Sequence, residues 1–303
     1  RHHNFCPQTL AGEMAKFSDS ADEFDDGLVK ALGNKKLLKH RESDVKLLMA
    51  CCHADLLRIY CPESPYDIDT EQDTLRDVFE LLITQLAGVE DVKKASYPRY
   101  TYILERLALV KSCLLLGEFE SDDLQRQLVE TLFNAAHPDH PYRVEKHMLD
   151  VLKCCVDGGD IPQGVVDAVL ENLLEPKRSE RPAAYKLAKS FLELCAAQMQ
   201  AALHGFLQGC MPTNARTPQS EASELREEWP SLLLELCAIS PDTVTYLLPQ
   251  LGDVVTMEDE QTRLDGTRLL GELFLLPECN LAQQVPSLFD VAFLGRTKDI
   301  APE

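Results

Sequence analysis

The side chain best placed for chemistry is a single carboxylate held between two prolines. Glu63 lies in the stretch Cys61–Pro65, which reads Cys-Pro-Glu-Ser-Pro. Proline fixes its own φ angle and restricts the residue before it, so the backbone around Glu63 has little freedom left to lose. A partner that docks here meets a low entropic cost. The alternative is an ordinary loop that ends a helix, because proline is common after helices.

Histidines form the next candidate group. His137 and His140 share a proline-containing loop, and His147 follows. Structural zinc sites need a second pair of ligands at a regular spacing, and no cluster of cysteines or carboxylates provides one. His53 lies inside an apolar helical stretch and is interpreted as a hydrogen-bonded packing residue. We therefore expect no metal site.

An acidic run from Asp67 to Asp73 is similar to the start of a calcium-binding loop. The loop requires a glycine where Gln72 stands and a bidentate glutamate where Val78 stands, so we reject a calcium site. The chain also lacks a glycine-rich phosphate loop, a nucleophile elbow and a zinc-protease motif. These observations predict a protein that is not an enzyme and uses no cofactor.

The turn follows a helix predicted over residues 44–60. Apolar residues recur there at helical spacing and cover so much of the circumference that the helix is expected to be buried between neighbours. Asp44 can cap its start. Pro62 ends it near Tyr60. The apolar stripe consists of Val45, Leu48, Met49, Cys52, Leu56 and Ile59.

Nearly every other periodic segment is also helical, and alternating β-branched runs are absent. Inner helices of successive pairs begin near Val45, Tyr100, Val144, Tyr185, Leu225 and Leu264. The last five starts are roughly 40 to 44 residues apart, the period of HEAT repeats. The predicted fold is an all-α HEAT-repeat solenoid, in which stacked antiparallel pairs share a continuous core. The predicted helices span 8–17, 22–39, 44–60, 73–88, 97–117, 121–136, 142–156, 163–174, 182–195, 197–209, 219–238, 242–255, 259–275 and 285–295.

The chain is divided into two parts. Residues 1–42 are expected to form irregular N-terminal helices that cap the solenoid, and residues 43–303 to form the solenoid itself. The last residues resemble a loop that leads into another repeat, so we expect the solenoid to be truncated at its C-terminal end. Trp229-Pro230 is expected to kink or break the helix predicted there.

Composition limits the function further. The 303 residues include 50 acidic and 30 basic ones, for a net charge of −20. This balance argues against broad contact with nucleic acid and suits a soluble scaffold whose partners carry basic segments. The 11 cysteines follow apolar helical patterns, which indicates a reducing compartment, cytosol or nucleus. No segment has the length of a membrane span, so no membrane contact is expected.

Particular sequence segments indicate a more specific function than composition does. The segment Leu48–Tyr66 resembles the N-terminal signature of the cohesin regulators named for precocious dissociation of sisters, the PDS-five family. The resemblance continues in the same order through four other segments and covers most of residues 27–300. These are Tyr100–Ser112, His147–Asp150, Leu247–Leu251 and Phe293–Arg296.

The resemblance implies a non-enzymatic nuclear scaffold, associated with chromatin, that controls sister-chromatid cohesion and cohesin release. It implies as partners the wings-apart-like releasing factor, sororin-like antagonists and the cohesin kleisin subunit, the last through regions beyond this segment. Family members receive Tyr-Ser-Arg peptides at an Ala-Pro-(Asp/Glu)-Ala-Pro motif. The corresponding residues here are Cys61, Pro62, Glu63, Ser64 and Pro65, so both alanines are replaced.

We expect Glu63 to accept a bidentate pair of hydrogen bonds from a partner arginine. Tyr60 and Tyr66 are expected to provide apolar walls for an aromatic anchor. The alternative function is an acidic HEAT- or armadillo-type solenoid that serves as an adaptor in nuclear transport or trafficking. Charge alone does not separate these two scaffolds.

Overall fold

The computed structural model describes residues 7–17, 24–119, 121–157, 159–212, 224–245, 247–277 and 281–295. Helices are the only regular secondary structure within these ranges, which confirms the all-α prediction. The chain forms two compact units, residues 1–172 with 179–191 (unit 1) and residues 173–178 with 192–303 (unit 2). No helix of the described residues is long and apolar enough to cross a membrane.

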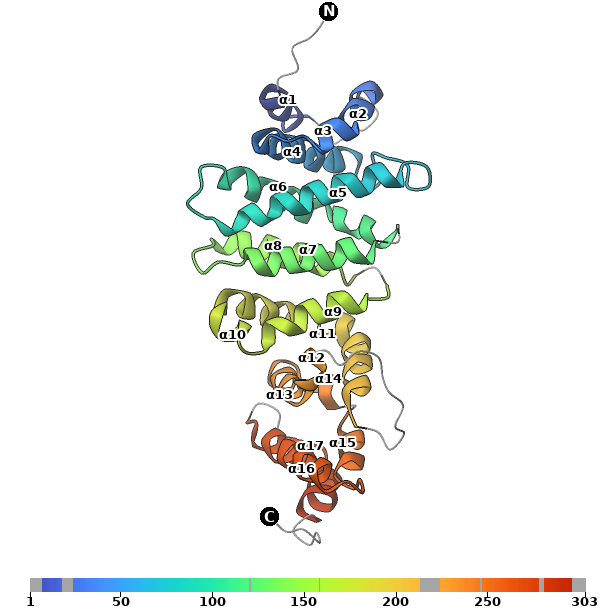
Figure 1. Ribbon diagram of the computed structural model, residues 1–303, viewed down its shortest axis with the longest axis vertical. Helices are drawn as coiled ribbons and strands as arrows, with labels where there is room; N and C mark the ends of the chain where they lie inside the picture. Colours follow the sequence, from blue (N-terminus) through green and yellow to red (C-terminus); the bar gives the residue numbers. More distant parts are fainter. Residues whose placement is uncertain are drawn as a thin grey trace, which may run out of the picture. The chain divides into compact units, whose positions relative to one another are not determined.

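Unit 1 is built from two layers of helices that stack in chain order (Figure 1). One layer contains α4 (Ser43–Tyr60), α6 (Tyr97–Val110) and α8 (Tyr142–Cys154). The other contains α5 (Gln72–Leu86), α7 (Asp122–Ala135) and α9 (Gln163–Leu170). The first three predicted repeat starts all fall in the α4, α6 and α8 layer, so the periodicity in the sequence corresponds to one layer of packed helices.

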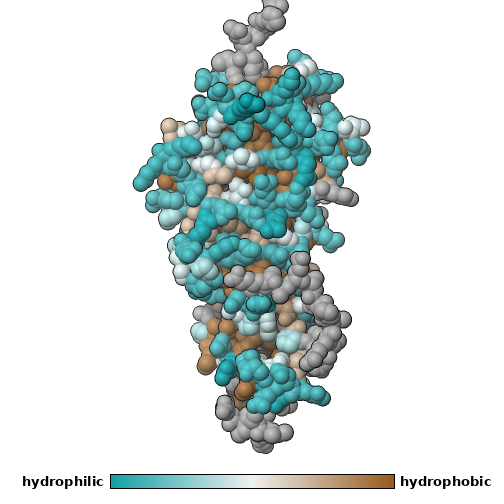
Figure 2. Space-filling view, viewed as in Figure 1, coloured by the Kyte–Doolittle hydropathy of each residue, from teal (hydrophilic) through white to brown (hydrophobic). Residues whose placement is uncertain are grey.

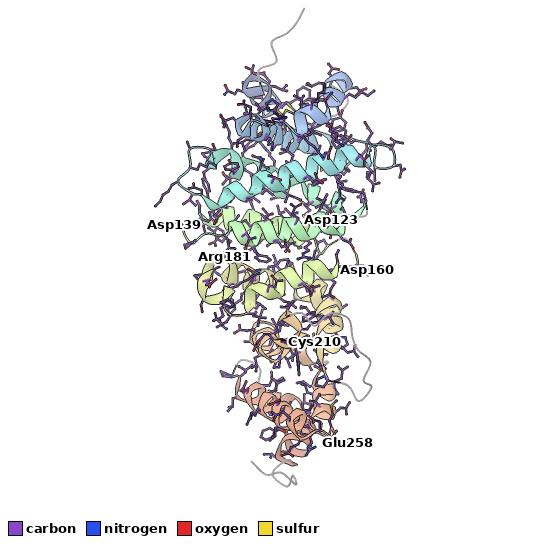
Figure 3. All side chains as sticks on the ribbon, viewed as in Figure 1. Asp123, Asp139, Asp160, Arg181, Cys210 and Glu258 are labelled. Atoms are coloured by element: carbon purple, nitrogen blue, oxygen red, sulfur yellow. The ribbon has the colours of Figure 1, made fainter. Side chains whose placement is uncertain are left out.

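Helix α4 is buried on most of its surface, as its apolar pattern predicted. Leu48, Cys52 and Leu56 are among its buried residues. Hydrophilic side chains cover most of the face shown in Figure 2, and apolar ones are visible in smaller patches. Among the side chains drawn in Figure 3, Asp123 of α7 pairs with Arg76 of α5 at the exposed side of the second layer. The core therefore lies between the two layers, and α4 is covered by further chain on its outer side.

Three short helices provide that cover: α1 (Pro7–Met14), α2 (Asp26–Leu32) and α3 (Lys35–Leu38). All three pack against α4. The single helix predicted over 22–39 is wrong, because two local caps divide it. The Asp25 side chain accepts a hydrogen bond from the Gly27 amide at 2.8 Å, and that of Asn34 accepts one from the Lys36 amide at 2.9 Å.

Other predicted helices are also interrupted. Helix α6 ends at Val110, since Lys111 has a φ of 53°, and a 3₁₀ turn, η3, continues over Ser112–Gly117. By contrast, the boundary predicted between the helices over 182–195 and 197–209 is confirmed, because α11 (Pro182–Cys210) has a kink with non-helical angles at Cys195. The connections include η2 (Ala87–Glu90), η4 (Glu171–Leu173) and α10 (Lys177–Glu180).

Unit 2 continues the all-helical pattern with shorter elements. The break expected at Trp229-Pro230 is confirmed, because α12 ends at Glu227 and α13 starts at Trp229. Helices α13, α15 and α16 bury leucines such as Leu236, Leu251 and Leu270. The elements are α12 (Glu224–Glu227), α13 (Trp229–Ile239), α14 (Pro241–Thr245), α15 (Leu248–Val254), α16 (Glu260–Leu275), α17 (Leu281–Gln284) and the π-helix η5 (Leu288–Phe293).

Candidate docking turn after helix α4

The turn that contains Glu63 closes directly on the end of α4. The Glu63 amide donates a hydrogen bond to the Tyr60 carbonyl at 2.8 Å, and the Cys61–Pro62 peptide is cis. At the other end of the turn the Tyr66 amide donates to the Ser64 hydroxyl at 3.3 Å. The backbone on both sides of Glu63 is thus hydrogen-bonded within the turn.

The tip of the turn faces solvent. Cys61, Pro62 and Glu63 are exposed, and Ser64 and Pro65 are half-buried. Within the described part of the chain, the Glu63 carboxylate has no hydrogen bond or ion pair. A carboxylate with free lone pairs on a fixed turn can accept two parallel N–H bonds from a guanidinium.

Tyr66 does not form the wall that the sequence analysis expected. Its ring is only 2 % exposed, and its hydroxyl donates a hydrogen bond to the Val29 carbonyl at 3.4 Å. The ring lies so close to Gly33 that a Cβ there would be 2.9 Å from it. Apolar burial of the ring therefore anchors the end of the turn to α2. Tyr66 positions the site and leaves no surface for a partner.

Tyr60 and Cys61 attach the other end of the turn. The half-buried Tyr60 ring packs edge-on against Phe24, with 6.4 Å between centroids. The Cys61 thiol lies 3.7 Å from the Val110 carbonyl, at the end of α6. The turn thus contacts the next helix of its layer. The exposed part of Tyr60 remains a predicted partner surface beside Glu63.

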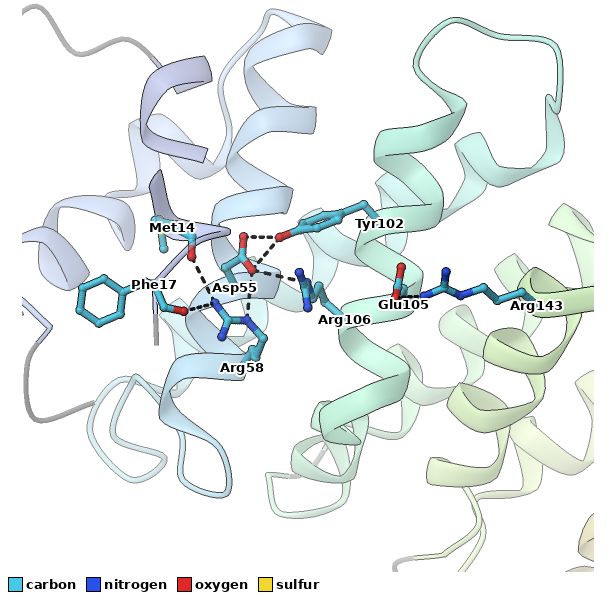
Figure 4. A network of polar contacts seen from close by, with 8 residues as sticks. All are labelled: Met14, Phe17, Asp55, Arg58, Tyr102, Glu105, Arg106 and Arg143. Atoms are coloured by element: carbon cyan, nitrogen blue, oxygen red, sulfur yellow. Dashed lines mark hydrogen bonds and ion pairs between the residues drawn. The ribbon is translucent and has the colours of Figure 1, made fainter. Parts of the chain in front are cut away.

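A buried polar network underlies the turn (Figure 4). The fully buried Asp55 carboxylate accepts hydrogen bonds from the Tyr102 hydroxyl at 2.8 Å and from Arg58 at 3.3 Å, and Arg106 lies 3.6 Å away. Burial raises the pKa of the Asp55 carboxyl, against the opposing effects of Tyr102 and the two arginines. The network joins α4 to α6.

Arg58 connects this network to the C-terminal end of helix α1. Its guanidinium donates hydrogen bonds to the carbonyls of Met14 at 3.1 Å and Phe17 at 3.2 Å. Met14 ends α1, where backbone carbonyls have no partner within the helix and a cation is favourable. One arginine in the last turn of α4 therefore holds α1 against the helix that carries the docking turn.

His53 is a packing residue as predicted, and the Leu32 backbone is its polar neighbour. The side chain is 1 % exposed, and neither ring nitrogen makes a hydrogen bond of ordinary length and angle with a described residue. Its ring lies against Tyr66, with 6.1 Å between centroids. Burial lowers the pKa of His53 to about 4. The imidazole is therefore neutral at physiological pH.

The histidine loop between α7 and α8 uses its nitrogens for structure. His140 Nδ1 lies 3.0 Å from the Tyr97 hydroxyl and Nε2 lies 2.9 Å from the Ala135 carbonyl. The carbonyl only accepts, so Nε2 donates and Nδ1 accepts from Tyr97. Within the described residues, no group of three or more potential ligand side chains could hold a metal ion.

The cysteines of the described residues are free thiols, and most are buried. Burial raises the pKa of Cys51 and of Cys52 to about 12, so both thiols are protonated and unreactive. They act as small apolar core residues, which is the role that their helical pattern predicted.

The family model described as "Sister chromatid cohesion protein PDS5 protein" matches residues 8–303. This chain belongs to the PDS5 family. The resemblance seen in the segment Leu48–Tyr66 is thereby confirmed for nearly the whole sequence.

Curated PDS5 homologues are similar in sequence to this chain over the same region. The chain is 36 % identical to sister chromatid cohesion protein PDS5 homolog A of Gallus gallus over 286 residues, which cover 93 % of this chain and 21 % of that protein. It is also 36 % identical to homolog B-A of Xenopus laevis over 290 residues, 95 % of this chain and 20 % of that protein. This PDS5-family chain therefore spans about a fifth of the length of these relatives.

A solved structure has the same fold. A chain from the structure of the Pds5–Scc1 complex aligns with a TM-score of 0.77 at 22 % sequence identity, covering 98 % of this chain and 46 % of that one. At this identity the likeness concerns the fold, and it confirms the predicted HEAT-repeat solenoid.

Sequence reasoning found the turn but missed what supports it. Tyr102, Arg106 and Val110, all on α6, were not connected to the turn, and Tyr66 was given an outward role. One signal was available: Asp55 is a charged residue inside an apolar helical stripe, and a buried charge requires partners. The partners lie about one repeat further along the chain, a distance that local patterns do not encode.

Proposed function

We propose that this segment is the peptide-docking part of a non-enzymatic cohesin regulator of the PDS5 family. The exposed and unpaired Glu63 on its anchored turn is the observation that carries the proposal. The turn requires little further ordering on binding, so a short peptide retains most of its contact energy. The occupant is a Tyr-Ser-Arg peptide whose arginine meets Glu63 and whose aromatic residue packs beside Tyr60.

The family suggests which proteins carry such peptides. We assign the site to the wings-apart-like releasing factor and to sororin-like antagonists, which would compete for one turn in the nucleus, on chromatin. The solved structure of similar fold is a complex of Pds5 with Scc1. Because this chain spans about a fifth of its relatives, we place its contact with the cohesin kleisin in regions outside the matched segment.

Isothermal titration calorimetry of a Tyr-Ser-Arg peptide tests the proposal. Glu63→Arg replaces attraction by repulsion, so affinity should fall at least about tenfold, or ~1.4 kcal/mol. Glu90→Arg, at an exposed position of η2, provides a matched change in net charge and should bind normally. Melting curves should show that both variants fold. Equal affinity of Glu63→Arg and the unchanged chain would refute the site.

A further inference from the structure

Charge is divided unevenly between the two helix layers of unit 1. Helices α4, α6, α8 and α11 as far as Phe191, the last joined to α8 by Lys186, carry nine basic and five acidic residues, a net charge of +4. Helices α5, α7 and α9 carry two basic and seven acidic residues, a net charge of −5. A cationic layer is unexpected in a chain with a net charge of −20.

Some of these cations are neutralised within the layer. Arg143 pairs with Glu105, and Lys186 pairs with Glu145 at 3.1 Å. Both pairs join neighbouring helices, and Figure 4 shows the first of them beside the buried network. These basic residues hold the layer together and have little attraction left for a ligand.

Four other cations remain available. The side chains of Arg99, Lys146, Lys153 and Lys189 have no hydrogen bond or ion pair with any described residue. Arg99 and Lys146 are exposed, while Lys153 and Lys189 are half-buried. They lie on three successive helices, so the free positive charge recurs from helix to helix.

An aromatic residue lies one helical turn before Lys146, one of the two exposed cations. The Tyr142 side chain is 79 % exposed at the start of α8. Lys153 follows two turns later on the same side of the helix, because Val144 and Val151 occupy the buried side. The outer face of α8 thus offers an apolar ring followed by two cations.

We propose that the basic face, defined by Arg99, Tyr142, Lys146, Lys153 and Lys189, binds an extended acidic peptide. Packed helices lie about 8–10 Å apart. A chain in the extended polyproline II conformation advances about 3.1 Å per residue and repeats its side-chain direction at every third residue. A carboxylate at every third position therefore meets one helix after another. Tyr142 provides the apolar contact for a phenylalanine or leucine within such a peptide.

The same face is poorly suited to nucleic acid. Asp150 lies among its cations and would repel phosphates, and the ion pairs of Glu105 and Glu145 leave Arg143 and Lys186 little charge for a nucleic acid. A duplex carries a charge about every 1.7 Å, a density that the four free cations do not match. An acidic peptide can place its carboxylates at the free cations and avoid Asp150.

Fluorescence anisotropy with a labelled synthetic peptide tests this interface. The peptide carries glutamate at every third position and one phenylalanine, and a glutamine version is the neutral control. The chain should bind only the acidic peptide. Lys146→Glu combined with Lys189→Glu should weaken binding at least about tenfold. Lys30→Glu combined with Lys36→Glu, at exposed sites on α2 and α3, makes the same change in net charge and should bind normally.

Three results would overturn the proposal: no binding of the acidic peptide at low salt, equal weakening by both double variants, or tighter binding of a DNA duplex that depends on Lys146 and Lys189. Melting curves establish that the variants fold. If the Lys146→Glu, Lys189→Glu double variant unfolds, the single variant Lys146→Gln takes its place. Glu63→Arg should bind the acidic peptide unchanged, which separates this interface from the docking turn.

Discussion

At the scale of single residues, the structure separates the exposed side chains of the turn, which we propose to contact a partner, from the buried ones that hold the turn in place. Glu63 is exposed, whereas Tyr66 is buried three residues later. The sequence could locate the turn, since two prolines after an apolar helix are a local signal. It could not show which tyrosine faces inward, because that depends on Val29 and Gly33, which lie more than thirty residues earlier in the chain.

His53 makes stability depend on pH. Its pKa is about 4 in the folded chain and about 6.5 when unfolded, so the unfolded state binds the extra proton between these values. Stability should therefore be fully present above about pH 6.5 and should be lost as pH falls towards 4. The loss from this residue between about pH 7.5 and about pH 5 is ~2 kcal/mol.

His53→Leu removes the titrating group and keeps an apolar side chain at the buried position. Urea unfolding at both pH values should show a smaller acid-induced loss for this variant than for the unchanged chain. His204→Leu, at a half-buried position of α11, is the control for the same change of residue type elsewhere in the chain. A pH dependence that is identical in all three proteins would show that His53 does not remain neutral on folding.

At the scale of helices, polar contacts join each member of the α4, α6, α8 and α11 layer to the next. Asp55 meets Tyr102, Glu105 meets Arg143, and Glu145 meets Lys186. The helices were largely predictable because they depend on local apolar periodicity. These contacts were not, since each joins residues roughly forty positions apart, about one repeat.

Burial should determine how much each contact contributes to the free energy of unfolding. Tyr102→Phe removes a hydrogen bond to a fully buried carboxylate and should cost about 1.5–3 kcal/mol of unfolding free energy. Arg143→Ala removes a pair whose arginine side chain is 71 % exposed and should cost less than about 1 kcal/mol. Chemical denaturation measures both, and equal costs would contradict the role assigned to the buried network.

A glycine permits the close approach of α6 to η2. A Cβ on Gly88 would lie 2.4 Å from the Tyr100 ring, which is buried and has little room to move. Gly88→Ala should therefore destabilise the chain by about 1–3 kcal/mol. Gly205→Ala, on an exposed part of α11 with nothing near its Cβ position, should be neutral or stabilising. Thermal melting compares the two, and equal effects would exclude steric crowding at Gly88.

At the scale of the whole molecule, net charge affects how partners approach. A net charge of −20 attracts a cationic peptide over long distances, and salt screens this attraction. In stopped-flow measurements the association rate of a Tyr-Ser-Arg peptide should fall several-fold with rising salt, while the dissociation rate changes less. An association rate that does not change with salt concentration would show that the net charge does not attract the peptide.

A charge exchange between the chain and its peptide tests the central claim most directly. Calorimetry is carried out on the unchanged chain and on Glu63→Arg, each with a Tyr-Ser-Arg peptide and with a Tyr-Ser-Glu peptide. If the Glu63 carboxylate receives the arginine, each protein will prefer the peptide of opposite charge, and the exchanged pair will recover binding. If Glu63→Arg binds the arginine peptide as tightly as the unchanged chain does, or if neither protein discriminates between the two peptides, the turn is not the docking site.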